Sequence, residues 1–116
     1  MGYDKLFAAK WEFVANISTA TGTTTLVAAP GAGRRLVVQA LMVCVTTSAA
    51  QAFDIEDSSG TVELFKGPAS LAVNAFPVDP GPLGHELTIN EALQYTATAG
   101  VGCTLSGFGY IKENVS

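Results

Sequence analysis

The chain has 116 residues and a formal net charge of −4 at pH 7, with 14% charged and 48% hydrophobic residues. Its length suits a single domain with one modest core. The six Lys and Arg residues are scattered along the chain, which argues against nucleic-acid binding, because that function needs clustered positive charge. Charged residues fall well below the usual share of about a quarter, so we expect much of the surface to be buried in an assembly.

The first nine residues lack the alternation of a strand, yet they contain an apolar cluster of Tyr3, Leu6 and Phe7. Chain ends are usually disordered unless something holds them. We therefore predict a short N-terminal arm, residues 1–9, that docks on a partner or on a sister subunit. A frayed end or one short helical turn is the alternative.

Two strands are predicted next. Residues 10–17 alternate in polarity, with Trp11 and Phe13 on one face and Val14 on the opposite, more polar face. Residues 23–29 are rich in threonine and valine and end at a proline, which cannot donate a hydrogen bond to a neighbouring strand.

Residues 34–46, RRLVVQALMVCVT, form the longest apolar run of the chain. Read as a strand, its even positions from 36 to 44 are all apolar, and its odd positions are polar at first and apolar towards the end. Both faces of this strand therefore need cover, from another strand or from a neighbouring subunit. Together with two aromatic residues of the last strand, the second face gives the candidate subunit-interface residues: Val37, Leu41, Val43, Val45, Phe108 and Tyr110.

A helix is the competing interpretation of the same run, since several of its apolar residues also fall at helical spacing. Four valines favour the strand, because β-branched side chains lose freedom in a helix and pack well on a pleated sheet. The preceding Pro-Gly-Ala-Gly is typical of a turn and offers no good helix N-cap.

The second half of the chain continues with short strands. Residues 51–56 and 61–66 flank an Asp-Ser-Ser-Gly turn and predict a hairpin. Further strands are predicted over the following ranges, with a proline-rich loop at 77–84 between the first two: 71–78, 85–90, 93–98 and 103–112. In the last strand Gly107 and Gly109 share a face with Leu105 and Ile111, which indicates that backbone or aromatic groups approach closely there.

Eight or nine short strands with turn signals between them predict an all-β antiparallel sandwich. For about eight strands in this length, a jelly roll is our first choice. An immunoglobulin-like sandwich is second; it leads one to expect a cysteine and tryptophan arrangement that is absent here, because Trp11 precedes both cysteines. The predicted domains are the arm, residues 1–9, and a jelly-roll domain, residues 10–116.

No catalytic or metal-binding signature is apparent. The one histidine, His85, has no nucleophile or orienting carboxylate at an informative spacing, and the glycines near residue 31 fail as a dinucleotide fingerprint because Leu36 replaces the third glycine. The acidic residues Asp54, Glu56, Asp57 and Glu63 are interpreted as a solvated face of the hairpin. We expect no enzyme activity, no cofactor and no metal site.

Cysteine content and hydropathy give two further expectations. Cys44 and Cys103 both lie in apolar runs, which favours two buried free thiols over a disulfide. No apolar run approaches the roughly 20 residues of a membrane-spanning helix, and residues 1–10 show no secretory pattern. We therefore expect a protein made in the cytoplasm and not bound to membranes.

The stretch from about Pro30 to Glu113 resembles small structural proteins of tailed bacteriophage virions, the capsid decoration or cement proteins. The likeness rests on a turn that leads into a long strand and on the C-terminal pattern of glycine and tyrosine; the matching residues are Gly33, Arg34, Arg35, Leu36, Val37, Leu93, Gly107, Tyr110 and Ile111. The sequence departs from the pattern at Asn90-Glu91, where a glycine is usual.

This resemblance implies a jelly-roll protomer that forms a homotrimer on the outside of the virion and stabilises the lattice of the major capsid protein. The candidate capsid contacts are Tyr3, Lys5, Leu6, Phe7 and Trp11. The alternative is a receptor- or glycan-binding fibre or tail module that uses loops such as residues 78–84. An enzyme that depends on His85 is a third and weaker interpretation.

Overall fold

The computed structural model describes residues 9–17, 22–46, 53–66, 74–81, 83–97 and 102–113. These residues form nine strands and contain no helix: β1 Lys10–Ile17, β2 Gly22–Val27, β3 Arg34–Val45, β4 Phe53–Asp57, β5 Glu63–Lys66, β6 Asn74–Val78, β7 His85–Glu86, β8 Leu93–Ala97 and β9 Cys103–Glu113. The all-β prediction is confirmed. The predicted arm up to residue 8, and the first three residues of the predicted strand 71–78, lie outside the described residues.

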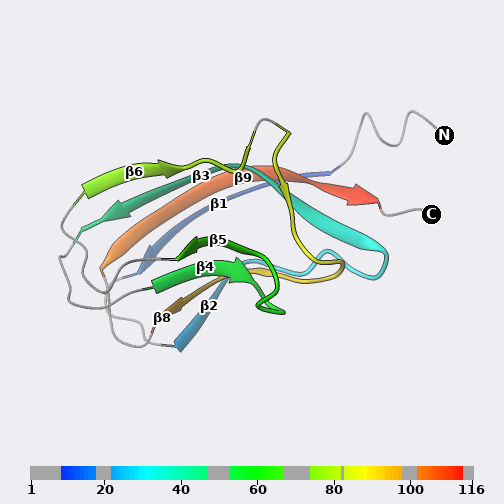
Figure 1. Ribbon diagram of the computed structural model, residues 1–116, viewed down its shortest axis with the longest axis horizontal. Coiled ribbons are helices and arrows are strands. Elements are labelled where there is room, and N and C mark those ends of the chain that lie inside the picture. The colour runs from blue at the N-terminus through cyan, green and yellow to red at the C-terminus, as the bar shows by residue number, and fades with distance from the viewer. Residues whose placement is uncertain are drawn as a thin grey trace.

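The strands make two antiparallel sheets packed face to face (Figure 1). The first sheet has the order β1-β9-β3-β6, with the short β7 also paired to β3, and the second has the order β2-β8-β4-β5. Four nested antiparallel pairs, β1–β9, β2–β8, β3–β6 and β4–β5, describe one long hairpin rolled into a sandwich. This order is that of a jelly roll, so the predicted fold is confirmed and the immunoglobulin-like alternative is wrong.

The core lies between the sheets. Phe53 of β4 is central, because its ring centroid lies 5.2 Å from that of Tyr95 on β8 and 5.2 Å from that of Phe65 on β5. Leu36 and Leu105 of the first sheet are fully buried and belong to the same hydrophobic cluster. Each such side chain contributes about 1.5–3 kcal/mol by leaving water, and the alternating apolar residues of the strands supply them.

Two glycines of β9 allow aromatic rings to lie close over the inner face of the first sheet. Trp11 pairs with Gly109 and Phe13 pairs with Gly107. A Cβ on Gly109 would lie 2.5 Å from Cζ2 of Trp11, and one on Gly107 would lie 3.0 Å from Cε1 of Phe13. Only glycine leaves room for these rings, so the predicted close approach on this face is confirmed.

Strand β3 contains a β-bulge between Val38 and Ala40, where its register with β9 shifts. A bulge adds one residue to one strand and therefore changes which side chains point inward. Before the bulge the even positions face the core, and after it the odd positions do: the inward residues are Leu36, Val38, Leu41, Val43 and Val45. The predicted uniform even face of this strand is wrong for this reason.

A buried carboxylate joins the β4–β5 turn to the segment after β7. Asp57 is fully buried; its Oδ1 accepts hydrogen bonds from the Ser59 amide at 3.1 Å and from the Thr61 amide at 3.2 Å, and its Oδ2 accepts one from the Thr88 amide at 3.0 Å. Burial opposes ionisation, but hydrogen bonds from Thr88 and Ser59 outweigh it and lower the pKa of Asp57 to about 2. The interpretation of Asp57 as part of a solvated acidic face is therefore wrong.

The predicted strand 85–90 is shorter than expected and ends at Glu86. The chain turns at Asn90, whose φ of 56° lies in the left-handed region that asparagine tolerates better than most residues. Its Oδ1 accepts a hydrogen bond from the Gly31 amide at 2.9 Å, and its own amide donates to the Arg34 carbonyl at 2.7 Å. Asn90 thus has the left-handed backbone conformation that glycine readily adopts, and it lies where the resemblance leads one to expect a glycine.

Candidate functional site

The outward face of the first sheet carries a cluster of exposed apolar side chains. Strand register places Glu12, Phe108 and Ala40 in one row across β1, β9 and β3. The next row consists of Val14, Ser106 and Met42, with Pro77 of β6 beside Met42. We call the apolar members of these two rows the outer apolar face: Val14, Ala40, Met42, Pro77 and Phe108.

Three large side chains of the outer apolar face are well exposed. The exposed fraction is 75% for Val14, 52% for Phe108 and 44% for Met42. Single exposed apolar residues are ordinary, but neighbouring ones on adjacent strands mark an interaction surface. Covering each of these side chains would contribute about 1 kcal/mol, because part of the surface is already removed from water.

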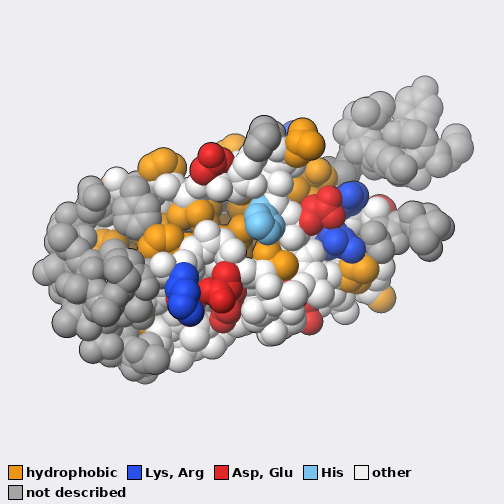
Figure 2. Space-filling model, in the orientation of Figure 1, with side chains coloured by type: hydrophobic (Ala, Val, Ile, Leu, Met, Phe, Trp, Pro, Cys, Tyr) orange, Lys and Arg blue, Asp and Glu red, His pale blue; other side chains and the backbone are white. Residues whose placement is uncertain are grey.

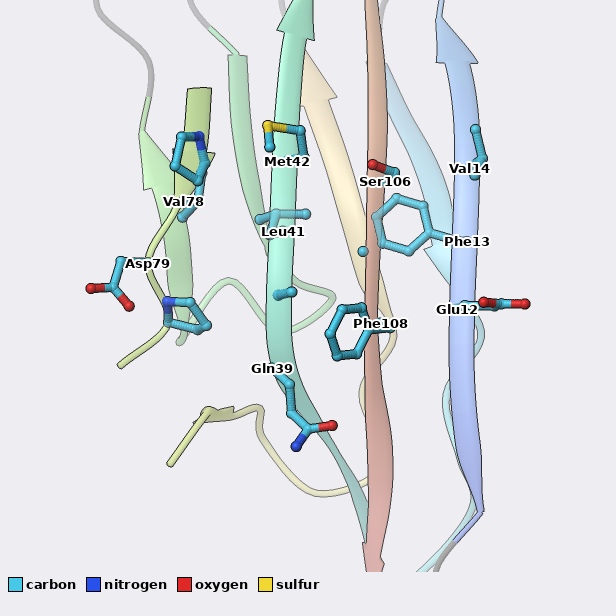
Figure 3. A pocket seen from close by; sticks show the side chains of 14 residues that line it. Glu12, Phe13, Val14, Gln39, Leu41, Met42, Val78, Asp79, Ser106 and Phe108 are labelled. Carbon is cyan, nitrogen blue, oxygen red and sulfur yellow. The ribbon is translucent and has the colours of Figure 1, made fainter. Parts of the chain in front are cut away.

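The same face is hollowed into a groove of about 930 Å³. Figure 3 shows Val14, Phe108 and Met42 standing on three neighbouring strands beside this groove. Glu12 lies on the β1 side and Asp79 on the β6 side, and they are the charged residues among the described residues that line it. A second hollow of about 430 Å³ adjoins it and shares Glu12, Gln39 and Phe108 with it.

Three of the predicted interface residues are buried in the core of the sandwich. Leu41 is 3% exposed, and Val43 and Val45 are fully buried in the core of their own sandwich. Their assignment to a subunit interface is wrong, because the bulge turns the odd positions after Gln39 inward.

The other three interface candidates have different positions. Val37 is buried at 1% exposure; it lies beneath Gly84, where an added Cβ would be 2.9 Å from Val37 Cγ1, so the chain itself covers this part of β3. Phe108 is exposed on the outer apolar face and Tyr110 is half-buried on the same side of β9. Their role in an interface stays a prediction.

Of the predicted capsid contacts, only Trp11 lies within the described residues. It is half-buried, packs against the core cluster and donates a hydrogen bond from Nε1 to the Tyr110 carbonyl at 3.1 Å. The structure therefore uses Trp11 in packing. Four candidates lie outside the described residues: Tyr3, Lys5, Leu6 and Phe7.

Sequence reasoning did not name Val14 or Met42 as interface candidates. Val14 had a signal, because it is an apolar residue on the polar face of an otherwise clean alternation between Glu12 and Asn16. Met42 had none, since its exposure depends on the bulge, and the residues after Gln39 are apolar on both faces and show no phase change in the sequence.

Within the described ranges, no group of three or more His, Cys, Asp or Glu side chains could hold a metal ion. His85 is exposed on the two-residue strand β7. Beside it, Glu86 accepts hydrogen bonds from Lys112 Nζ at 2.8 Å and from Arg35 Nη1 at 3.2 Å. The bond from Lys112 lowers the pKa of Glu86. Figure 2 shows such positive and negative side chains side by side, an arrangement of surface ion pairing.

The two cysteines are free, as predicted. Val45 pairs with Cys103 and Cys44 pairs with Thr104, so the thiols project to opposite faces of the first sheet and cannot meet. Cys103 is fully buried, and this burial, with Cys44 nearby, raises its pKa to about 11. Burial also raises the pKa of Tyr95 to about 12, with Cys103 as a smaller cause.

No protein-family model matches the chain, and no curated protein matches it significantly. No helix within the described residues is long and apolar enough to cross a membrane.

Proposed function

We propose that the protein is a structural virion protein, a capsid decoration protein whose copies associate through the outer apolar face into a homotrimer. The observation that carries this proposal is the exposure of Val14, Met42 and Phe108 on adjacent strands of one sheet. The second sheet already covers the opposite face of that sheet, and within the described part of the chain the outer face is left for another molecule.

The low share of charged residues supports the same proposal. Only 14% of the residues are charged, so charge repulsion between copies opposes their association only weakly. A trimer multiplies a modest contact with a repetitive lattice, because the second and third binding events are intramolecular once the first has occurred. Jelly rolls occur in viral capsid proteins and also in lectins, so the fold alone does not separate the two classes; the apolar floor of the groove favours a protein surface over a sugar.

The experiment compares the wild type with Phe108→Asp and, as a control, Thr25→Asp on the exposed part of β2. We expect light scattering to give the mass of a trimer for the wild type and the control, and of a monomer for Phe108→Asp. An aspartate at position 108 would bury an unpaired charge in the proposed apolar contact between copies. Thr25 lies on the other sheet, outside that contact.

The second measurement is binding to capsids of a phage whose genome encodes the chain, assembled without it. The wild type should saturate these capsids, and the monomeric Phe108→Asp should bind at least a hundredfold more weakly because avidity is lost. A monomeric wild type that fails to bind capsids but binds a glycan saturably would instead support the receptor-binding alternative.

A further inference from the structure

We infer that the occupant of the groove is the N-terminal segment, residues 1–8, of a second copy of the chain. This inference rests on the self-association in the proposed function and names the contact that makes it. It follows from the chemistry of the groove, from the sequence of the segment and from the place where the described chain begins.

The groove and the segment are complementary in polarity and charge. The described lining offers an apolar floor with Val14, Met42 and Phe108, and its charged groups are carboxylates, Glu12 and Asp79, on opposite sides. Residues 1–8, MGYDKLFA, combine the apolar Tyr3, Leu6 and Phe7 with one acidic and one basic side chain, Asp4 and Lys5. The aromatic and aliphatic anchors suit an apolar floor of this kind, and Lys5 suits the carboxylates at its two sides.

The segment is long enough for this role. An extended chain spans up to about 3.3–3.6 Å per residue, so eight residues reach about 26–29 Å. The groove crosses the four strands β1, β9, β3 and β6, and neighbouring strands lie about 4.8 Å apart, which makes about 14 Å across the sheet. The reach therefore exceeds the width of the groove and leaves residues to bridge two copies.

The start of β1 favours a second copy over the same one. The Ala9 carbonyl accepts a hydrogen bond from the Ile111 amide at 2.7 Å, so pairing with β9 continues one residue beyond Lys10. To return over its own outer face the chain would have to reverse sharply at residues 8–10, Ala-Ala-Lys. None of these residues supplies turn chemistry, which relies on Gly, Pro, Asn, Asp or Ser.

A concave surface also disfavours direct contact between two identical grooves. Two outer faces brought together about a two-fold axis would place a hollow against a hollow and bring Glu12 and Asp79 of both copies near an apolar interface, with Lys10 of the adjoining hollow as a cation beside Glu12. An exchanged segment fills the hollow and brings Lys5 to these carboxylates.

The first test is a charge exchange between segment and groove. Lys5→Glu and Glu12→Lys should each weaken association roughly tenfold by placing like charges together, and the double variant should recover most of the loss. Deletion of residues 1–8 should give a monomer with unchanged circular dichroism. Asp54→Lys, a reversal on the second sheet outside the groove, is the matched control and should leave the mass unchanged.

The second test locates the segment directly. A photo-crosslinking phenylalanine analogue at position 7 is placed in protein made with natural isotopes and in ¹⁵N-labelled protein, and the two are refolded together. We expect heavy-to-light cross-linked peptides that contain Val14, Met42 or Phe108. Peptides joined only within one isotope form would assign the segment to its own copy and overturn the inference.

The outcomes separate this inference from the proposed function. A deletion variant that remains a trimer but no longer binds capsids would make the segment a capsid contact, so the inference would fail and the proposed function would stand. A wild type that is monomeric at all concentrations would remove the proposed self-association itself.

Discussion

The first sheet has two apolar faces, one buried in the core and the other exposed to solvent. Its inner face is closed: Trp11 and Phe13 lie over Gly109 and Gly107, and the second sheet covers the rest. Its outer face leaves Val14 and Phe108 more than half exposed. Hydrophobicity alone therefore does not define an interior. Closure also needs a partner surface of matching shape, and the residues that the structure describes supply one on only one side of this sheet.

The largest expected effect comes from disturbing the closed face at Gly109. We expect Gly109→Ala to lower the free energy of unfolding by more than about 4 kcal/mol, because the added Cβ meets the Val37 carbonyl and the Trp11 ring, and backbone cannot move aside. Urea denaturation measures the loss. Ser106→Ala on the outer side of the same strand is the control and should stay within about 0.5 kcal/mol.

The second prediction compares the effects of alanine substitutions at two neighbouring residues of β3. Leu41→Ala should cost about 3 kcal/mol by leaving a cavity in the core, whereas Met42→Ala should cost less than about 1 kcal/mol in a monomer. Light scattering should show the reverse order for association, with only Met42→Ala weakening it. Equal losses of stability for the two variants would contradict the orientation of the strand after the bulge.

Much of the difference between these two faces could not be predicted from the sequence. The positions of β1, β3 and β9 follow from their alternation and β-branched content, and their predicted ranges differ from the observed ones by at most one residue. The bulge could not be predicted, because after Gln39 the run ALMVCV is apolar at both even and odd positions. The shift is fixed by the pairing of Val38 with Gly109 and of Ala40 with Phe108 on a distant strand.

Long-range polar contacts were equally hidden. The local sequence predicts Asp57 on the surface of a hairpin turn, but it is buried, and Thr88, 31 residues away, donates a hydrogen bond to it. The chain after β7 was predicted as strand from Leu87 and Ile89, yet Leu87 is buried and Ile89 is 38% exposed in a turn. A local pattern cannot show partners that come from elsewhere in the chain.

A third prediction concerns the charge held inside the closed sandwich. The pKa of Asp57 is lowered from 3.8 to about 2, so its ionised form stabilises the fold above about pH 4, and this stabilisation is lost as the pH falls through about 2. Asp57→Asn should therefore cost about 2 kcal/mol at pH 7, because the amide turns a donor towards the Thr88 amide.

Denaturation at pH 7, 4 and 2.5 tests this prediction. The difference between the wild type and Asp57→Asn should shrink as the pH falls, because below the unfolded-state pKa of 3.8 folding must remove a proton from the Asp57 carboxyl. Glu63→Gln, which removes only an exposed 3.9 Å ion pair with Lys66, should change the free energy by less than about 0.5 kcal/mol at each pH. A constant difference for Asp57→Asn would mean that its charge does not stabilise the fold.

The prediction with the smallest expected effect concerns the chemical reactivity of the two cysteine thiols, one on each face of the first sheet. Cys44 is half-buried on the outer side of β3 and should react with a maleimide in the native protein. Cys103 is buried, and with a pKa of about 11 only roughly one thiol in ten thousand is ionised at pH 7. It should react only when the protein unfolds, and mass spectrometry of the labelled peptides distinguishes the two. Rapid native labelling of Cys103 would show that the interior opens.

Because of the bulge at Gln39, a single backbone unit decides which side chains of this strand face the core and which face outward. Deleting that unit would turn Met42 and Cys44 towards the core and send Leu41, Val43 and Val45 out to solvent. A deletion of this one residue would thus exchange the inward and outward side chains of the strand without any substitution. In an alignment of related sequences, a one-residue gap at this position would therefore indicate an altered binding surface.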